Sequence, residues 1–459
     1  MEIKKKVNLT ISILFIIFMI PTFVFANNNT VDTETKKEMN KSLVNTIQGK
    51  EDGFSYRIKD KKAYILSYDT KEEKIKNLKI PEEIKGCPVV DIRDGAFKNT
   101  PIVNITIPEN IENIGEFAFY NCKLLERVTI NGCKKIDKYA FSNCISLKDV
   151  VLEEGTKQIG DNAFMNCGIE NINIPASVTK LGKNVFTNCI NLKSFNVNKD
   201  NKKFKSEDGV LYSNDMKKLI SYPVSKPDKE YTVNDSTRTI ESAAFYSNKY
   251  IENLTLPSKL NTINTLAFYN TKNLTDIEIP KNVKKINNEA FYGSINLKNV
   301  TFKGTEEIGK NAFAECENLQ TVKLSDNMHI LKSGAFKNCT MIKDIELPNS
   351  LYTMEAEVFR GCSSLQKISI PDNINYIRDY TFADCNDLKE VDLNEGVTNI
   401  NKKAFSNCPN LTKVEASYSL RFIGKTSFDD SKKVVIHAPY GSYGIYYANE
   451  NNIKSKVIQ

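Results

Sequence analysis

The sequence is poor in the residues that most often carry chemistry. Its 459 residues include no tryptophan and only two histidines, His329 and His437. We expect His329 to lie in solvent and His437 in a strand near the C-terminal end. The sequence shows no nucleophile–base pair, no phosphate-binding glycine loop and no cluster with metal-ligand spacing. We therefore expect no enzyme, no cofactor and no metal.

A concentrated basic face is missing as well. The chain has 63 Lys and Arg against 56 Asp and Glu, a net charge of +7, and the excess is scattered along it. Nucleic-acid binding needs basic residues gathered on one face, so we expect no nucleic-acid partner. After Ala26 no apolar run is long enough to cross a membrane. With 41% hydrophobic residues the chain can still bury a large core.

The first residues have the composition of a secretory signal. Lys4, Lys5 and Lys6 precede an apolar run that ends at Val24-Phe25-Ala26. This order predicts a signal peptide over residues 1–26, with an uncleaved membrane anchor as the alternative. Residues 27–52 are polar and without a period, and we interpret them as a mobile leader. The expected location is extracellular, either free or loosely associated with the cell surface.

The remainder of the chain repeats itself. A phenylalanine, usually preceded by a small or branched residue, recurs at steps of 22 or 23 residues, with one step of 59 between Phe186 and Phe245. A fixed short period indicates a stack of similar units, because each unit is too small to bury its own apolar side. The recurring residues are Phe97, Phe119, Phe141, Phe164, Phe186, Phe245, Phe268, Phe291, Phe313, Phe336, Phe359, Phe382, Phe405 and Phe428.

Each unit has a constant apolar frame. In one of them Ile368 and Ile370 alternate with polar residues, which is the period of a β-strand. Ile374 and Ile377 then return the chain along a second wall. We expect the glycine of the Ile-Gly pairs to supply a positive φ for the turn that follows; these are Gly115, Gly160, Gly182, Gly309 and Gly424.

This frame resembles leucine-rich repeats, and more narrowly the bacterial BspA-like class. The resemblance rests on Leu365-Gln366-Lys367-Ile368-Ser369-Ile370-Pro371, followed by Ile374, Ile377, Thr381-Phe382 and Cys385. It implies a repeat solenoid: a leucine-rich-repeat stack of short parallel β-strands with irregular or short helical connections, capped at both ends, with one inserted β-hairpin. It also implies a surface or secreted protein that binds partners, in several cases for adhesion.

The order of the segments follows from the repeats. After the signal peptide and the leader we expect an N-terminal cap over residues 53–95, leucine-rich repeats over 96–191, an inserted hairpin over 192–236, further repeats over 237–431 and a C-terminal cap over 432–459. The connection of the hairpin is expected at Ser213–Lys217.

Eleven cysteines in a secreted chain would ordinarily indicate disulfides. Nine of them occupy one slot, three residues after a repeat phenylalanine, so their side chains are expected to lie parallel in a ladder. Free, buried thiols are the favoured interpretation, and disulfides between neighbouring rungs and metal binding are the alternatives. The nine are Cys122, Cys144, Cys167, Cys189, Cys316, Cys339, Cys362, Cys385 and Cys408.

The expected functional surface is the outward side of the strands, where repeats present a regular polar array. A row of tyrosines directly after three consecutive phenylalanines could grip a protein or stack on sugars. We therefore expect an adhesin-like module that binds a protein of a host or of its own cell surface, with a glycan- or envelope-binding module as the alternative. The candidate residues are Tyr246, Tyr269, Tyr292, Asp276, Glu278, Asp344, Glu346, Glu390 and Asp392.

Overall fold

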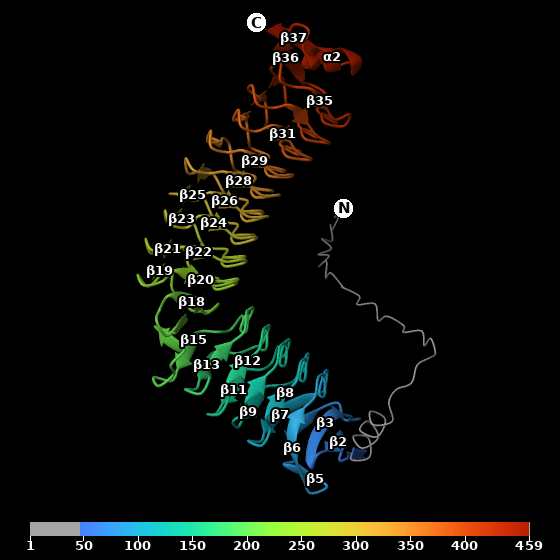
Figure 1. Cartoon of the computed structure of the whole chain (residues 1–459), viewed down its shortest axis with the longest axis vertical. Coiled ribbons are helices and arrows are strands. Elements are labelled where there is room, and N and C mark those ends of the chain that lie inside the picture. The colour runs from blue at the N-terminus through green and yellow to red at the C-terminus, as the bar shows by residue number, and fades with distance from the viewer. Residues whose placement is uncertain (1–45, 459) are drawn as a thin grey trace, which may run out of the picture. The chain divides into compact units, whose positions relative to one another are not determined.

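The computed structural model describes residues 46–458, and these form a repeat solenoid of short strands and turns with the single helix α2, Tyr443–Glu450 (Figure 1). The predicted fold class is confirmed. The expected signal peptide and most of the expected leader lie outside the described residues. The end of that leader is different from the expectation, because Ile47–Glu51 forms strand β1, which pairs antiparallel with β2.

The repeats contribute one strand to each of two opposite faces, except that residues 342–348 form no long strand. The longer strands form the long-strand face: β7 Ile102–Ile107, β9 Arg127–Ile130, β11 Asp149–Leu152, β13 Asn171–Ile174, β15 Ser194–Val197, β19 Glu230–Thr232, β21 Asn253–Thr255, β23 Asp276–Ile279, β25 Asn299–Phe302, β27 Thr321–Lys323, β30 Lys367–Ser369, β32 Glu390–Asp392 and β34 Lys413–Glu415. Two-residue strands form the short-strand face: β8 Asn113–Ile114, β10 Lys135–Ile136, β12 Gln158–Ile159, β14 Lys180–Leu181, β20 Thr239–Ile240, β22 Thr262–Ile263, β24 Lys285–Ile286, β26 Glu307–Ile308, β28 Ile330–Leu331, β29 Thr353–Met354, β31 Tyr376–Ile377, β33 Asn399–Ile400 and β35 Phe422–Ile423.

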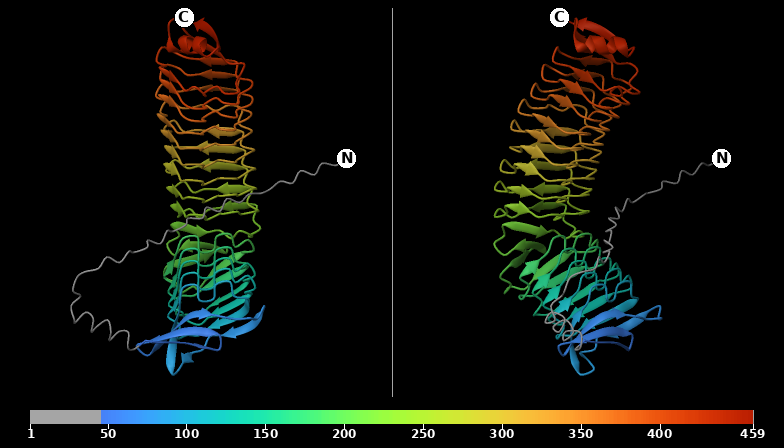
Figure 2. Two further views of the ribbon diagram at one scale, coloured as in Figure 1. Left: turned by 90° about the vertical axis from the view of Figure 1, so that its right-hand side faces the viewer. Right: turned by 45° about the vertical axis from the view of Figure 1, so that its right-hand side comes forward.

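Strands of successive repeats pair in parallel, rung upon rung (Figure 2). Asp149 of β11 lies opposite Arg127 of β9, for example. Within a strand the period of two decides which side chains enter the core. In β23 the alternation leaves Asp276 and Glu278 exposed and buries the two isoleucines.

Two residues of left-handed conformation shape the turn that follows each short strand. In one repeat these are Asn162, with φ 56°, and Asn166, with φ 60°. Asparagine tolerates this region better than most residues, and in six repeats an asparagine directly precedes the slot cysteine. Positive φ is found at all six of those positions: Asn121, Asn143, Asn166, Asn188, Asn338 and Asn407.

The expectation for the Ile-Gly glycines was wrong. None of the five has a positive φ. Instead, a Cβ on Gly160 would lie 2.6 Å from the backbone nitrogen of Lys138, and one on Gly182 would lie 2.4 Å from that of Asp161. Glycine is needed there because the turn passes too close to the preceding rung to leave room for a side chain.

The core between the two faces is a ladder of stacked phenylalanine rings. Phe268, Phe291 and Phe313 are buried, and their neighbouring ring centroids lie 4.7 and 4.8 Å apart. The buried apolar residues fall into two clusters, one from Phe54 to Leu211 and one from Val210 to Ala448. The ladder is therefore interrupted where the long step in the sequence predicted an insertion.

The cysteine slot is buried as expected, and all eleven cysteines are free in the structure. In every one of the nine repeats concerned, the thiol donates a hydrogen bond to the carbonyl of the phenylalanine one repeat earlier. Cys362 Sγ lies 3.3 Å from Phe336 O, and Cys385 Sγ lies 3.2 Å from Phe359 O. In the last repeat Ser431 occupies this position, and its hydroxyl donates the same hydrogen bond to Phe405 O. The position therefore holds a small side chain that can donate a hydrogen bond.

Additional elements cover the ends and form the insertion. The first repeat packs on β2 Phe54–Lys59, β3 Lys62–Tyr68, β4 Ile75–Lys79, β5 Glu83–Ile84 and β6 Cys87–Ile92. Helix α2 lies between β36 Val435–Pro439 and β37 Lys454–Ile458 at the C-terminal end (Figure 1). The insertion contains β16 Phe204–Glu207, β17 Val210–Ser213 and β18 Lys218–Ser221, joined as antiparallel neighbours.

Candidate functional site

The long-strand face carries the acidic residues predicted from the sequence, but it does not gather them. Asp276 and Glu278 lie together on β23, and Glu390 and Asp392 lie together on β32. Asp344 and Glu346 are exposed, but their segment forms no strand, and the ladder is interrupted between β27 and β30. The predicted continuous array is therefore two separate pairs and an irregular segment.

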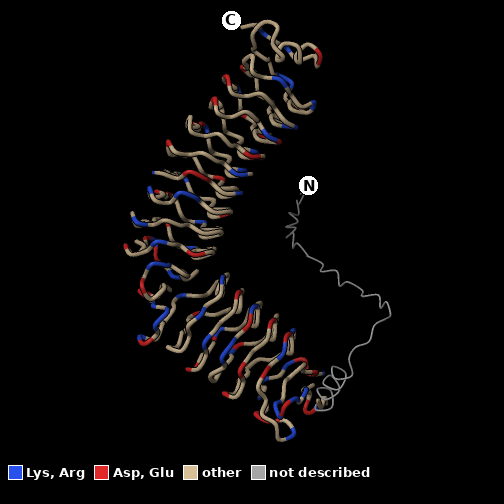
Figure 3. The backbone as a smooth tube through the Cα atoms, viewed as in Figure 1, with Lys and Arg blue, Asp and Glu red and all other residues tan. Residues whose placement is uncertain are grey.

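Neighbouring side chains already partner three of these six carboxylates. Asp276 accepts a hydrogen bond of 2.6 Å from the amide of Asn299. Glu278 and Glu390 form ion pairs with Lys303 at 3.2 Å and Lys367 at 3.7 Å. Basic and acidic residues are interspersed in this way along all the described repeats (Figure 3). Such exposed pairs each contribute little free energy and leave no strong field of one sign.

The three tyrosines predicted as a platform form a regular stack. The ring centroids of Tyr246 and Tyr269 lie 4.9 Å apart, and those of Tyr269 and Tyr292 lie 5.2 Å apart, with interplanar angles of 4° and 8°. Partial burial raises the pKa of all three hydroxyls. Because the three rings stack, both faces of the central ring, Tyr269, are covered. A sugar stacks on an exposed ring face, and Tyr269 does not offer one.

Four aromatic side chains that the sequence analysis did not select lie on the short-strand face of the C-terminal repeats. We call His329, Tyr352, Tyr376 and Phe422 the aromatic patch. The rings of His329 and Tyr352 are stacked with centroids 5.5 Å apart. Tyr352, Tyr376 and Phe422 are 55%, 48% and 47% exposed, whereas most apolar residues of these repeats are buried.

The short strands position this patch. Tyr376 and Phe422 each directly precede a buried isoleucine in β31 and β35, so the strand alternation turns them outward. Both align with Asn399 of β33, which lies between them in the register. The rungs of the sheet β31-β33-β35 therefore space Tyr376 and Phe422, whereas His329 and Tyr352 directly precede β28 and β29 of the neighbouring sheet.

The same positions in the earlier repeats are mostly polar. The residue before the buried member of each short strand is Asn113, Lys135, Gln158, Lys180, Thr239, Thr262, Lys285 and Glu307 in turn. This contrast was available in the sequence, in the outward positions of the second wall. It was missed because only the first strand of each repeat was read for exposed residues.

Basic residues adjoin the patch. The guanidinium of Arg378 lies 5.7 Å from the centre of the Tyr376 ring, and Arg421, directly before Phe422, is exposed. An apolar surface with cations beside it favours a partner that offers apolar side chains with carboxylates close to them.

The structure assembles no metal site within residues 46–458, where no three potential ligands come together. His329 belongs to the aromatic patch, and His437 lies on β36. Partial burial, together with Lys456 and Lys413, lowers the pKa of His437. In the described part of the chain, no helix is long and apolar enough to pass through a lipid bilayer.

Comparison with known proteins agrees with the repeat geometry. The model of the BspA type leucine rich repeat region (6 copies) matches residues 63–193, 226–339 and 306–435. A leucine-rich repeat protein from Bacteroides ovatus is 23% identical, with 85% of this chain and 98% of that chain covered and a TM-score of 0.53. The pneumococcal vaccine antigen PcpA is 21% identical, with 90% and 99% covered and a TM-score of 0.50. Nothing matches among curated proteins.

Proposed function

The chain belongs to the BspA-type leucine-rich repeat family, and on that premise we propose that it is a secreted, adhesin-like protein that binds another protein through the aromatic patch. The family suggests a protein-interaction or surface role, and the solenoid provides a rigid scaffold for one. The proposed mechanism is contact between surfaces and involves no reaction.

The single observation that carries this proposal is the exposure of Tyr352, Tyr376 and Phe422 on the short-strand face. Binding energy at protein interfaces is concentrated in a few aromatic and arginine residues. The patch supplies three exposed rings with Arg378 and Arg421 beside them. The acidic pairs on the long-strand face lack such an anchor and are already paired within the chain.

Secretion is supported by the sequence of residues 1–26 alone, which carries the order of a signal peptide. The glycan-binding alternative depended on the tyrosine row. Since Tyr246, Tyr269 and Tyr292 stack on one another, no observation favours it over binding of a protein.

The test is binding of the purified chain to a panel of extracellular-matrix proteins, glycans and intact cells at physiological salt. A partner that binds saturably is then titrated with the double variant Tyr352→Ser and Tyr376→Ser. We expect its affinity to fall at least about tenfold, since loss of a hot spot costs about 2 kcal/mol or more and 1.4 kcal/mol is tenfold.

The matched control replaces two more exposed tyrosines of the C-terminal cap, Tyr440→Ser and Tyr446→Ser, which are 81% and 62% exposed. This variant should bind like the unmodified chain. Equal affinity of the patch variant and the unmodified chain would rule out the patch, and saturable binding to glycans alone would rule out the protein partner.

A further inference from the structure

Successive turns of the solenoid are joined by a backbone ladder on the phenylalanine side. The N–H of a repeat phenylalanine donates to the carbonyl of the residue that precedes the next one, as in Phe141 to Ala163 at 2.8 Å and Phe164 to Val185 at 3.0 Å. Twelve of the fourteen repeat phenylalanines make this bond. The exceptions are the last of each run, Phe186 and Phe428.

At Phe186 a complete set of donors is left without a partner. In the preceding repeat Asn162, Phe164 and Asn166 donate to the next turn at 2.9, 3.0 and 3.0 Å. The backbone N–H groups of their equivalents Asn184, Phe186 and Asn188 donate no hydrogen bond within residues 46–458. Near Phe428 the terminal elements lie over the end of the stack, and Tyr447 of α2 bonds to Gly424. Phe186 faces the junction with the insertion instead.

The short-strand face is open at the same level. Lys157 O accepts from Thr179 and Lys180, and Ile159 O accepts from Gly182. The next carbonyls in this series, those of Thr179 and Leu181, accept no backbone hydrogen bond from the described residues, and β14 is the last strand of its sheet. On this one rung, therefore, the carbonyls of Thr179 and Leu181 and the backbone N–H groups of Asn184, Phe186 and Asn188 all lack a backbone hydrogen-bond partner within the described residues.

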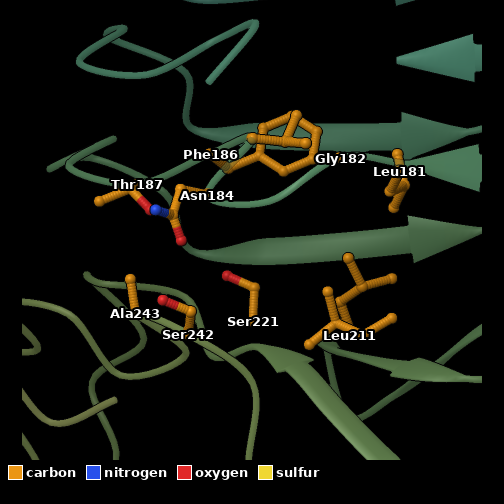
Figure 4. Close-up of a pocket in the computed structure, with 11 residues that line it drawn as sticks. Leu181, Gly182, Asn184, Phe186, Thr187, Leu211, Ser221, Ser242 and Ala243 are labelled. Atoms are coloured by element: carbon orange, nitrogen blue, oxygen red, sulfur yellow. The ribbon is translucent and has the colours of Figure 1, made fainter. Parts of the chain in front are cut away.

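Two of these residues, Leu181 and Asn184, line a cleft. It has a volume of about 640 Å³ and is lined by β14, by the turn after it and by the insertion and the following repeat. A smaller cavity of about 30 Å³ shares Leu181, Asn184 and Ser242 with this cleft. Figure 4 shows Asn184 and Phe186 on one side of the smaller cavity, with Ser221 and Ser242 on the other. The side-chain oxygen Oδ1 of Asn184 is buried and has no hydrogen-bond partner. Buried polar groups are normally satisfied, so this oxygen calls for a donor.

The insertion explains why the cleft exists. Tyr222 takes the phenylalanine position of the second run: its ring stacks on Phe245 at 5.0 Å and its N–H donates to Ala244 O at 2.7 Å. On the other side Phe186 meets Phe195 edge-on at 5.4 Å. The rings are thus covered on both sides of the junction while the backbone of one rung is missing.

We propose that this cleft binds one extended polypeptide segment of a partner protein, which takes the place of the missing rung. Its carbonyls would accept from Asn184, Phe186 and Asn188, and its N–H groups would donate to Thr179 and Leu181. Addition of a strand to an open sheet edge is an established mode of peptide recognition. Since Phe195 already packs against Phe186, the residue of the segment at the phenylalanine position must be small. This site is separate from the aromatic patch and does not depend on it.

The probe is a peptide with the sequence of residues 156–166, TKQIGDNAFMN, carrying Phe164→Ala, with a scrambled peptide as control. Hydrogen exchange is followed by mass spectrometry on the whole chain. In the free chain the amides of residues 184–188 should exchange at least about tenfold faster than those of residues 162–166. Saturating peptide should slow them at least about tenfold, and the scrambled peptide should not.

A bulky side chain in the cleft should abolish the protection of residues 184–188 by the peptide. Ser242→Trp places a large ring in the cleft, whereas Asn288→Trp makes the equivalent change in a closed rung. The first variant should lose peptide protection and the second should keep it. Exchange at residues 184–188 that is already as slow as at 162–166, or that is unchanged by saturating peptide, overturns the proposal. Protection that persists in Ser242→Trp also overturns it.

Discussion

Phe291→Ala tests the idea that each rung is stabilised by its two neighbours. The Phe291 ring is fully buried and stacks on Phe268 at 4.7 Å and on Phe313 at 4.8 Å. Truncation of a buried phenylalanine costs about 3–5 kcal/mol, and the loss of stacking on both sides places this site at the upper end of that range. Phe428→Ala is the matched control, since Phe428 is 8% exposed and stacks on Phe405 alone, and it should cost less.

The assay is native-state hydrogen exchange, because a repeat array need not unfold in one step. We expect the free energy of local opening to fall by about 3–5 kcal/mol in the repeats from Phe268 to Phe313. Exchange in the cluster from Phe54 to Phe195 should not change, because the insertion separates the two cores. A loss below about 1 kcal/mol, or equal acceleration in both clusters, would refute the nearest-neighbour account.

Two predictions concern the cysteine slot. Cys362→Ser should keep the hydrogen bond to Phe336 O, whereas Cys362→Val should leave that carbonyl with the Cys339 N–H as its remaining donor and cost about 0.5–1.5 kcal/mol; equal thermal stability of the two variants would contradict this. Burial raises the pKa of the Cys189, Cys362 and Cys408 thiols to about 12. Above the ordinary thiol pKa of about 8.5 the unfolded chain therefore loses protons that the folded chain keeps, so the free energy of unfolding should fall as the pH rises from about 9 toward 12. Urea titrations across this range should show a shallower fall when the slot cysteines of the second run are replaced by serine, and an identical fall would count against the assignment.

The sequence by itself determined the stack. The 22- or 23-residue step of Phe268, Phe291 and Phe313 predicted the ring ladder, because a unit of that length must bury its apolar side on its neighbours. The cysteine slot predicted parallel buried thiols for the same reason. The long step after Phe186 predicted the insertion and its hairpin.

The tertiary structure decided which surfaces are available. The tyrosine row was visible in the sequence, but only the stacking of its rings shows that both faces of Tyr269 are covered. Asp344 looked equivalent to Asp276 by position, although the sheet does not continue through its segment. The sequence predicted a positive φ for Gly160, but glycine is required at this position because the backbone of the preceding rung leaves no room for a Cβ.

The tertiary structure also decides which groups are exposed in the aromatic patch and in the cleft. Tyr376 and Phe422 are 46 residues apart in the sequence. They lie on the same face, on either side of Asn399, because β31, β33 and β35 pair in register. The N–H groups of Asn184, Phe186 and Asn188 are open because the partner of each turn is supplied by the next turn, which the insertion displaces. The repeating sequence determines the strands, turns and core residues of one rung. The exposure of the side chains and backbone groups of that rung depends on which of them the next rung covers.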